Sequence, residues 1–303
     1  MKKLFMAVIA LMMTISASAQ FYIYCSDGNV IKVDSISIVA PTESDAPDEP
    51  DGPIIPDEPA TPSAGIGTFS VSADKQVTFS PGNLQYHPVN DEWRFAPSQL
   101  DHIGDANSNC SPTYNGWLDL FGWSTGATNF VSTSQDYADY SGSFVDWGAN
   151  QIGSDAPNTW RTLPFEEWDY LLNTRTNASS LKGVAQVNGV NGLIFLPDNW
   201  VCPAGITFKS GFNSNSGVDY YAAYQTFTAA EWSKLESAGA VFLPAAGVRD
   251  GSSVGNVQRV GYYWSATEYD SSSVYYLYFL SGAANMGGNP HYAGQSVRLV
   301  KDL

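Results

Sequence analysis

The stretch GYYWSATEYD, residues 261–270, decides how the chain folds, because four aromatic residues and two acids lie within ten positions. A β-strand with strict alternation would put Tyr262 and Trp264 on one face and Tyr263 on the other. Large aromatic side chains within strands are usually buried, so we expect Trp264 to belong to a core. The stretch therefore predicts a core strand rather than a catalytic motif.

Downstream of this strand the sequence is polar, and we expect a loop that begins at Tyr269. The segment from Tyr275 to Tyr292 is rich in Tyr, Asn, Ser, Gly, Ala and His. Tyr gives a large contact area at low cost in side-chain entropy, and Asn offers adaptable hydrogen bonds, so this composition suits a display surface. The candidate ligand-binding residues are Tyr269, Asp270, Tyr276, Tyr278, Asn285, Asn289, His291 and Tyr292. We expect Glu268 to tie the strand to Arg298 or to cap a neighbouring turn.

Upstream, the stretch WRTLPFEEWDYLLNTR at residues 160–175 predicts an α-helix. Pro164 suits the first helical position, and four apolar side chains, with Trp168 among them, share one face. Glu166 and Glu167 are adjacent, so they point in different directions and cannot work as a carboxylate pair. Trp168 is therefore expected to be structural.

A second helix is predicted by TFTAAEWSKLESAG at residues 226–239. Thr228 is followed three residues later by Glu231, which is the pattern of a capping box, and Gly239 suits the end of the helix. We expect Trp232 to pack this helix on the core.

Strands are expected around these helices and at the start of the body. Apolar runs lie at Leu193–Pro197 and Ala240–Pro244, each downstream of a helix. Four further runs, separated by turn residues, predict an opening antiparallel meander: Thr68–Ser72, Gln76–Ser80, Asn83–His87 and Glu92–Ala96. Residues 101–159 show neither helical nor strand periodicity, and we expect Trp117, Trp123 and Trp147 to anchor them.

The first 65 residues predict three short segments before this body. Residues 1–19 have a basic start, an apolar run and Ala-Ser-Ala before the expected cleavage site, as in a secretory signal peptide. Residues 20–40 suggest a small β-hairpin with an Asp-Gly turn and a third strand near Ile36. Residues 41–65 are acidic and Pro-rich, which predicts an extended linker. The body is then residues 66–303.

The charge of the chain limits its partners. The full sequence has a formal net charge of −16, and removal of Lys2 and Lys3 with the signal leaves 12 − 30 = −18. Nucleic acids and anionic membrane surfaces would repel such a chain. No segment is long and apolar enough for a transmembrane helix, so we expect no membrane insertion. Of the three cysteines, Cys110 and Cys202 could form a disulfide or remain small buried side chains.

No constellation of residues requires an enzyme. Gly122-Trp123-Ser124-Thr125-Gly126 matches a nucleophile-elbow pattern, but it lacks the preceding apolar strand and the following helix, so we interpret it as a turn. The three histidines have no metal-binding spacing. Asp101, Asp105, Asn107 and Asn109 supply alternating oxygens without the glycine and closing acid of a calcium loop. No metal or cofactor is expected, although calcium in another geometry stays open.

Two motifs resemble known families. WRTLPFEEWDYLL is similar to a signature of formylglycine-generating-enzyme-like domains, and GYYWSATEYD with the later GQSVRLVKD resembles the end of bacterial major-paralogous-domain (FISUMP-like) surface proteins. The likeness covers about residues 160–301. It implies an α+β, C-type-lectin-like fold with twisted antiparallel sheets, two helices and long irregular loops. The catalytic cysteines of those enzymes have no counterparts after Cys202, so the resemblance implies no activity.

We therefore expect an exported, non-catalytic, adhesin-like protein of the cell surface, periplasm or extracellular space. Its late loops would present Tyr and Asn to a glycan or a protein. Two alternatives remain open. One is a structural component of a cell-surface assembly. The other is a variable binding protein whose C-terminal segment is diversified by a retroelement, because such segments are rich in the residues that mutated Asn codons yield.

Overall fold

The computed structural model describes residues 21–24, 30–33, 67–124, 131–140 and 142–303. The chain divides into two compact units, residues 1–59 and 60–303. In the first, β1 (Phe21–Tyr24) pairs antiparallel with β2 (Val30–Val33), as the hairpin prediction has it. The predicted signal peptide, the Asp-Gly turn, the third strand near Ile36 and the linker lie outside the described residues.

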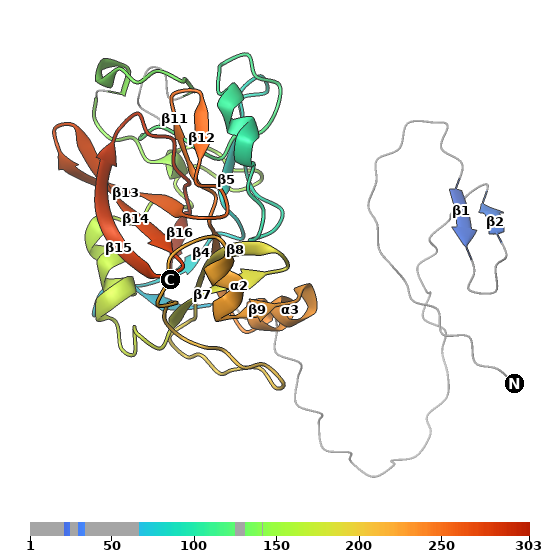
Figure 1. Cartoon of the computed structure of the whole chain (residues 1–303). Helices are drawn as coiled ribbons and strands as arrows, with labels where there is room; N and C mark the ends of the chain where they lie inside the picture. The colour runs from blue at the N-terminus through green and yellow to red at the C-terminus, as the bar shows by residue number, and fades with distance from the viewer. Residues whose placement is uncertain (1–20, 25–29, 34–66, 125–130, 141) are drawn as a thin grey trace, which may run out of the picture. The chain divides into compact units, whose positions relative to one another are not determined.

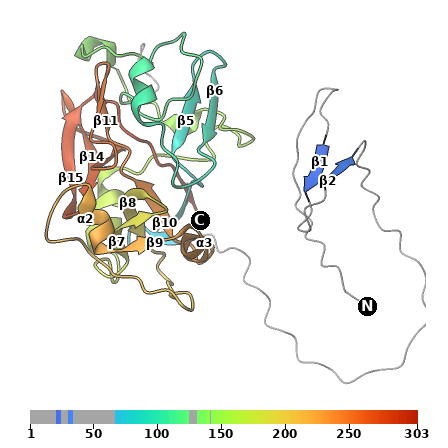
Figure 2. The ribbon, with the colours of Figure 1, turned by 45° about the vertical axis from the view of Figure 1, so that its right-hand side comes forward.

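The second unit is a mixed α+β body built from several small antiparallel sheets and few helices (Figures 1 and 2). Its strands are β3 (Phe69–Ser70), β4 (Gln76–Phe79), β5 (Leu84–His87), β6 (Glu92–Phe95), β7 (Lys182–Val187), β8 (Val190–Phe195), β9 (Thr226–Phe227), β10 (Val241–Pro244), β11 (Val248–Asp250), β12 (Ser253–Gly255), β13 (Gly261–Asp270), β14 (Ser273–Leu280), β15 (Ala283–Pro290) and β16 (Val300–Asp302). Its α-helices are α1 (Phe165–Asp169), α2 (Asp219–Tyr224) and α3 (Ala229–Ser237). The described part of the chain has no helix of the length and apolarity that crossing a membrane would need.

Both predicted helices are present. α1 begins after Pro164 and continues as a π-helical turn, η4 (Tyr170–Thr174), and Trp168 at its centre is fully buried. α3 has the predicted capping box, in which Thr228 Oγ1 accepts from the Glu231 N–H and Glu231 accepts from the Thr228 N–H. Trp232 is buried beneath α3. α2 is a further helix that the sequence pattern did not predict.

The two predicted apolar strands near the helices pair with each other. β8 lies between β10 and β7 in a four-stranded sheet whose order is β10-β8-β7-β9. Every residue of β10 is buried, as are five of the six residues of β8. Side chains alternate between the two faces of a strand, so one face of this sheet can pack on α3. Apolar residues from this sheet and from α3 form one core cluster.

The opening strands were predicted correctly, but they do not form one meander. β4 pairs with β3 and β16, and β5 pairs with β6. Between β4 and β5 the chain bonds to a C-terminal segment instead, because the Ser80 N–H donates to Leu299 O and the Leu84 N–H donates to Val297 O. The last residues of the body therefore join the two opening strand pairs.

The irregular region is anchored on aromatic residues, as expected. Trp123 and Trp147 are at most 1% exposed, whereas Trp117 is half-buried, with the Arg94 guanidinium stacked on its ring at 3.6 Å. Where this region is described, its helical structure consists of three short 3₁₀ turns: η1 (Gly104–Asn109), η2 (Tyr137–Tyr140) and η3 (Trp147–Ala149). Cys110 is buried and Cys202 exposed, and both are free, so of the two alternatives the structure has unpaired cysteines, of which Cys110 alone is buried.

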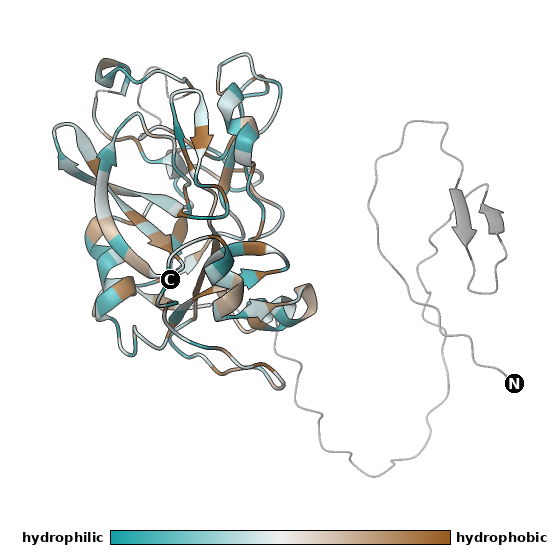
Figure 3. Ribbon diagram, in the orientation of Figure 1, coloured by the Kyte–Doolittle hydropathy of each residue, from teal (hydrophilic) through white to brown (hydrophobic). Residues whose placement is uncertain are grey.

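The predicted polar loop after Tyr269 is also wrong. Residues 261–270 form one long strand, β13, and residues 273–280 and 283–290 form β14 and β15, which add to it side by side (Figures 1 and 2). The pattern was missed because β15 reads AANMGGNP and has no continuous run of strongly hydrophobic residues (Figure 3). Cross-strand neighbours rather than intrinsic preference make it a strand.

The sheet β13–β15 separates two cores. Tyr263, Leu277 and Phe279 belong to one cluster on one face, and Trp264 and Val274 belong to another cluster on the opposite face. Trp264 is 1% exposed, which confirms its predicted burial. The expected alternation holds only as far as Trp264, because the pairing of β13 with β14 shifts between Trp264 and Glu268.

Candidate functional site

The face of the β13–β15 sheet that carries Trp264 also carries a group of tyrosines. Register places Tyr262 opposite Tyr278, and Trp264 opposite Tyr276. Residues directly opposite in an antiparallel pair point to the same face, so all four share it. Trp264 is buried at one end, whereas the three tyrosines are half-buried and reach the surface. Six of the eight candidate residues thus lie on strands rather than on a loop: Tyr269, Asp270, Tyr276, Tyr278, Asn285 and Asn289.

The tyrosine rings support one another. The rings of Tyr262 and Tyr276 stack with centroids 5.7 Å apart, and Tyr276 and Tyr278 lie 5.8 Å apart. Burial, together with the neighbouring phenols of Tyr262 and Tyr278, raises the pKa of Tyr276 to about 12. Burial also raises the pKa of Tyr262. The hydroxyls of Tyr262 and Tyr276 therefore stay protonated at neutral pH, and each can both donate and accept a hydrogen bond.

Beside these rings lies a surface hollow of about 280 Å³, which we call the tyrosine hollow. The residues that line it come from β11, β13, β14, β15 and the segment after β15: Val248, Asp250, Tyr262, Tyr276, Asn289, Pro290, Tyr292 and Ala293. Three candidate residues, Tyr276, Asn289 and Tyr292, are therefore brought together. Asp250, Val248 and Tyr262 were missed. Asp250-Gly251 is a sequence signal for the β11–β12 hairpin, which carries Val248 and Asp250, whereas Tyr262 lies on β13.

Some polar groups of the hollow are already paired. Tyr262 Oη accepts from Asn256 Nδ2 at 3.1 Å, and Asp250 Oδ1 accepts from Gln135 Nε2 at 2.6 Å. The side chains of Tyr276, Asn289 and Tyr292 form no hydrogen bond within the described residues, although Tyr292 packs edge-to-face on Tyr137 at 5.3 Å. Unpaired donors and acceptors beside aromatic faces suit an uncharged polar ligand.

Two other candidates lie away from the hollow. Tyr269 is 56% exposed and packs edge-to-face on Tyr275, which points to the opposite face of the sheet. Asp270 Oδ1 accepts from the N–H and hydroxyl of Ser272, so it holds the β13–β14 turn. These hydrogen bonds lower the pKa of Asp270, and the bond from the backbone N–H of Ser272 has the largest effect.

His291 and Glu268 do not have the predicted roles. His291 is 6% exposed and stacks on Trp123 with ring centroids 5.1 Å apart, so it is a packing residue rather than a displayed one. Glu268 is exposed, and the Arg298 Nη2 donates to Gln99 Oε1 at 2.6 Å instead. Burial lowers the pKa of Arg298 to about 10. The predicted pairing of Glu268 with Arg298 is therefore wrong.

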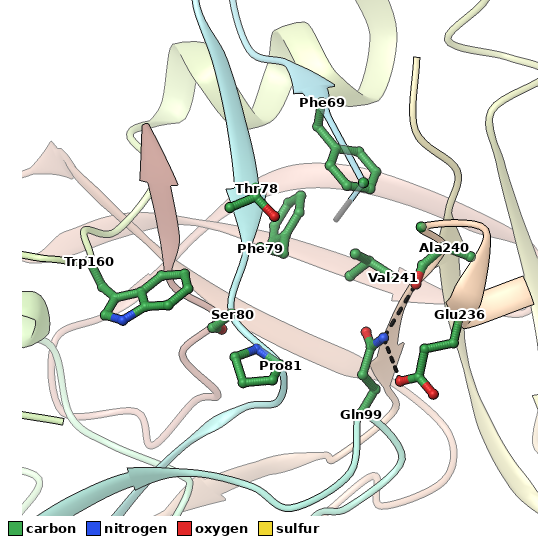
Figure 4. Close-up of a pocket in the computed structure, with 12 residues that line it drawn as sticks. Phe69, Thr78, Phe79, Ser80, Pro81, Gln99, Trp160, Glu236, Ala240 and Val241 are labelled. Carbon is green, nitrogen blue, oxygen red and sulfur yellow. Dashed lines mark hydrogen bonds between the residues drawn. The ribbon is translucent and has the colours of Figure 1, made fainter. Parts of the chain in front are cut away.

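A second cavity, of about 400 Å³, lies between β4, the start of β10 and the end of α3 (Figure 4). Phe69, Phe79 and Val241 give it apolar walls, and Trp160 stands at its opposite side. Its Gln99 Nε2 donates to Glu236 Oε1 at 2.8 Å and to Ala240 O at 3.3 Å, so these polar groups satisfy one another. We prefer the tyrosine hollow as a site because three of its polar side chains, Tyr276, Asn289 and Tyr292, form no hydrogen bond within the described residues.

The other chemical candidates have structural roles in the part of the chain that is described. Ser124 is buried, and its Oγ accepts from the Val145 N–H at 2.8 Å. The Asn107 amide bonds to the buried Asp119, and Asp101 accepts from the Ser98 N–H, so these oxygens hold turns. The described residues contain no group of three His, Cys, Asp or Glu side chains able to hold a metal ion. Calcium in another geometry stays a prediction.

Comparison with known proteins gives one match. The model of a family described as a domain of unknown function (DUF8237) matches residues 222–300. This range includes β10 to β15 and every residue that lines the tyrosine hollow. No curated protein and no solved structure matches the chain. The chain is thus similar to this family over its last part, where the hollow lies.

Proposed function

We propose that the chain is an exported, non-catalytic binding protein that takes a neutral glycan in the tyrosine hollow. The observation that carries this proposal is the convergence of unpaired side-chain groups of Tyr276, Asn289 and Tyr292 beside stacked tyrosine rings. A sugar ring presents apolar C–H groups on its faces and hydroxyls at its edge. Aromatic faces and free hydrogen-bonding groups match both features.

The size and charge of the hollow narrow the ligand. Its volume of about 280 Å³ is at the lower end of pockets that enclose small molecules, so it suits one sugar ring held at the surface. Asp250 brings a carboxylate to the rim, which favours hydroxyl donors and disfavours anionic sugars. The negative charge of the whole chain acts in the same direction.

We also propose a fold for the body and a location for the chain. The body would have a C-type-lectin-like fold, which is supported by its small antiparallel sheets, its few helices and the two sequence motifs. The signal peptide predicted in residues 1–19 would export it to the periplasm, cell surface or medium. Fractionation of cells that express the full chain, with detection of the mature N-terminus, tests this part separately.

Tyr276→Phe is the variant that tests the glycan proposal. The full mature chain is first screened on a glycan array, and the strongest ligand is measured by calorimetry. Loss of the Tyr276 hydroxyl removes one neutral hydrogen bond, so the affinity should fall about tenfold with no change in melting temperature. Chelation of divalent cations with EDTA should leave the affinity unchanged.

Tyr278→Phe is the matched control, because Tyr278 lies on the same strand and face but does not line the hollow. It should bind like the native chain. Equal losses in Tyr276→Phe and Tyr278→Phe, or no glycan binding by the native chain, would contradict the proposal. Loss of binding in EDTA that is restored by added calcium would show that calcium is required.

A further inference from the structure

β15 is the edge of the β13–β15 sheet, and its outer side is open. The sheet order is β13-β14-β15, and among the described strands β15 pairs with β14 alone. In the described part of the chain, the backbone of Ala284 to Asn289 forms no hydrogen bond beyond this pairing. The outward N–H and C=O groups of an edge strand are a template for another strand.

The usual protections of an edge are missing from β15. Its register with β14 runs without a bulge from one end to the other, and its proline stands at the last position. No Asp, Glu, Lys or Arg occurs from Ser271 to Val297. Other strands of the body are protected: β6 carries Glu92 and Arg94, β16 carries Lys301 and Asp302, and β3 and β9 have two residues each. β15 is thus a long, uncharged edge.

Two tyrosine rings hold β15 extended. A Cβ on Gly287 would lie 3.0 Å from the ring of Tyr276, and a Cβ on Gly288 would lie 3.1 Å from the ring of Tyr269. Neighbouring residues of a strand point to opposite faces, so one ring covers each face of the glycine pair. Aromatic cover of this kind stabilises glycines in strands. The edge is therefore presented as an ordered strand.

We propose that β15 pairs with β15 of a second copy of this chain, antiparallel, about a two-fold axis at Gly287. The acidic chain would repel an acidic partner strand, and β15 of a second copy brings no charge to the uncharged edge. A two-fold axis perpendicular to the sheet keeps each face on its own side, so opposite residues share a face. This pairing continues the two sheets as one six-stranded sheet.

The register about Gly287 fits the side chains. It places Asn285 opposite Asn289 of the second copy, where two amides can exchange hydrogen bonds. It places Met286 opposite Gly288 of the second copy, so a long side chain meets an empty position. The neighbouring register, about Met286, would set two methionines against each other and leave Asn285 opposite a glycine. Side-chain pairs opposite each other in this way determine strand register.

This pairing would also join the two tyrosine faces. Tyr276 lies opposite Gly287 in the β14–β15 register, so the two Tyr276 residues would lie on one line across the axis. Three strand spacings of about 4.8 Å separate their backbones, which gives roughly 14 Å. Two hollows on one continuous face could engage a repeated ligand together. The self-association itself does not depend on what the hollow binds.

A charge-swap experiment on the full mature chain tests the pairing and its register, with sedimentation equilibrium as the readout. The native chain should form dimers. Asn285→Lys with Asn289→Lys sets lysine opposite lysine twice, so the dissociation constant should rise about tenfold or more. Asn285→Lys with Asn289→Asp sets lysine opposite aspartate twice and should restore dimers. Asn90→Lys with Ser233→Lys, at exposed positions elsewhere, adds the same charge and should dimerise like the native chain.

The outcomes separate this proposal from others. A native chain that stays monomeric at high concentration overturns it. Dimers that survive the double lysine change place the interface elsewhere and overturn it as well. Weakening in both double variants, with no rescue by Lys and Asp, rejects the register about Gly287. Circular dichroism of each variant checks that the fold is kept.

Discussion

β8 and β15 are both antiparallel strands with glycine in the middle, but they are built in different ways. β8 is a central strand, and a Cβ on its Gly192 would meet the carbonyl of Leu243 and the ring of Phe242 on β10. β15 is an edge strand, and its Gly287 is covered by the ring of Tyr276. The first glycine allows two backbones to approach, whereas the second leaves space that an aromatic side chain fills. The structural role of a glycine in a strand therefore depends on the atoms that lie beside it.

Trp264→Ala should have the largest effect, because it removes the side chain that anchors β13 of the β13–β15 sheet in the core. Trp264 is 1% exposed, and its Nε1–H donates to Phe121 O at 2.7 Å. The substitution leaves a cavity and an unpaired carbonyl, so the free energy of unfolding should fall by about 3–5 kcal/mol. Urea denaturation measures this loss. Trp200→Ala, at a half-buried indole, is the control and should cost clearly less. Equal losses would mean that Trp264 is not a core anchor.

The sequence predicted the region of β8 and β10 because apolar runs and a capping box are local signals. Leu193–Pro197, Ala240–Pro244 and Thr228 each carry their own evidence, and the structure has all three elements. β15 carries no such signal. Its glycines and asparagines form a strand because they pair with β14. In this pairing Tyr276 lies opposite Gly287, eleven residues later in the chain, and Tyr275 lies opposite Gly288, thirteen residues later. For the same reason the sequence named Tyr276, Asn289 and Tyr292 but missed Asp250 and Tyr262, which only the fold brings to them.

Gly192→Ala should have the next largest effect and tests the central strand. Its new methyl group would meet the backbone of Leu243, which is fixed by the pairing of β10 with β8. Backbone cannot move aside as a side chain can, so we expect a loss of about 1–3 kcal/mol in the free energy of unfolding. Chemical denaturation at neutral pH gives the value. A neutral result would show that the two strands can separate without cost.

The packing of His291 beside the β13–β15 sheet should make stability depend on pH over a limited range. Burial lowers the pKa of His291, while Glu268 and Asp270 act in the opposite direction. The unfolded chain takes up a proton near pH 6.5, and the folded chain does so only at lower pH. This contribution to stability is therefore complete above about pH 6.5 and decreases as the pH falls toward the folded pKa.

His291→Phe isolates that contribution, because phenylalanine can keep the stacking on Trp123 but cannot titrate. The free energy of unfolding is measured at pH 7.5 and pH 5.0 for both chains. The native chain should lose more stability on acidification than the variant. An equal decrease would show that other groups account for the pH dependence.

Gly287→Ala should have the smallest effect on stability and gives the sharpest test of the comparison. Its methyl group would lie 3.0 Å from Cε1 of Tyr276, and that ring can rotate away at the surface. Alanine also restricts the unfolded chain, which offsets part of the strain, so stability should change by about 0.5 kcal/mol or less. Ligand affinity should nevertheless fall, because the displaced ring leaves its stack on Tyr262. If Gly287→Ala costs as much stability as Gly192→Ala, the Tyr276 ring cannot move aside. The two glycines would then be equally constrained, and the contrast between β8 and β15 would be wrong.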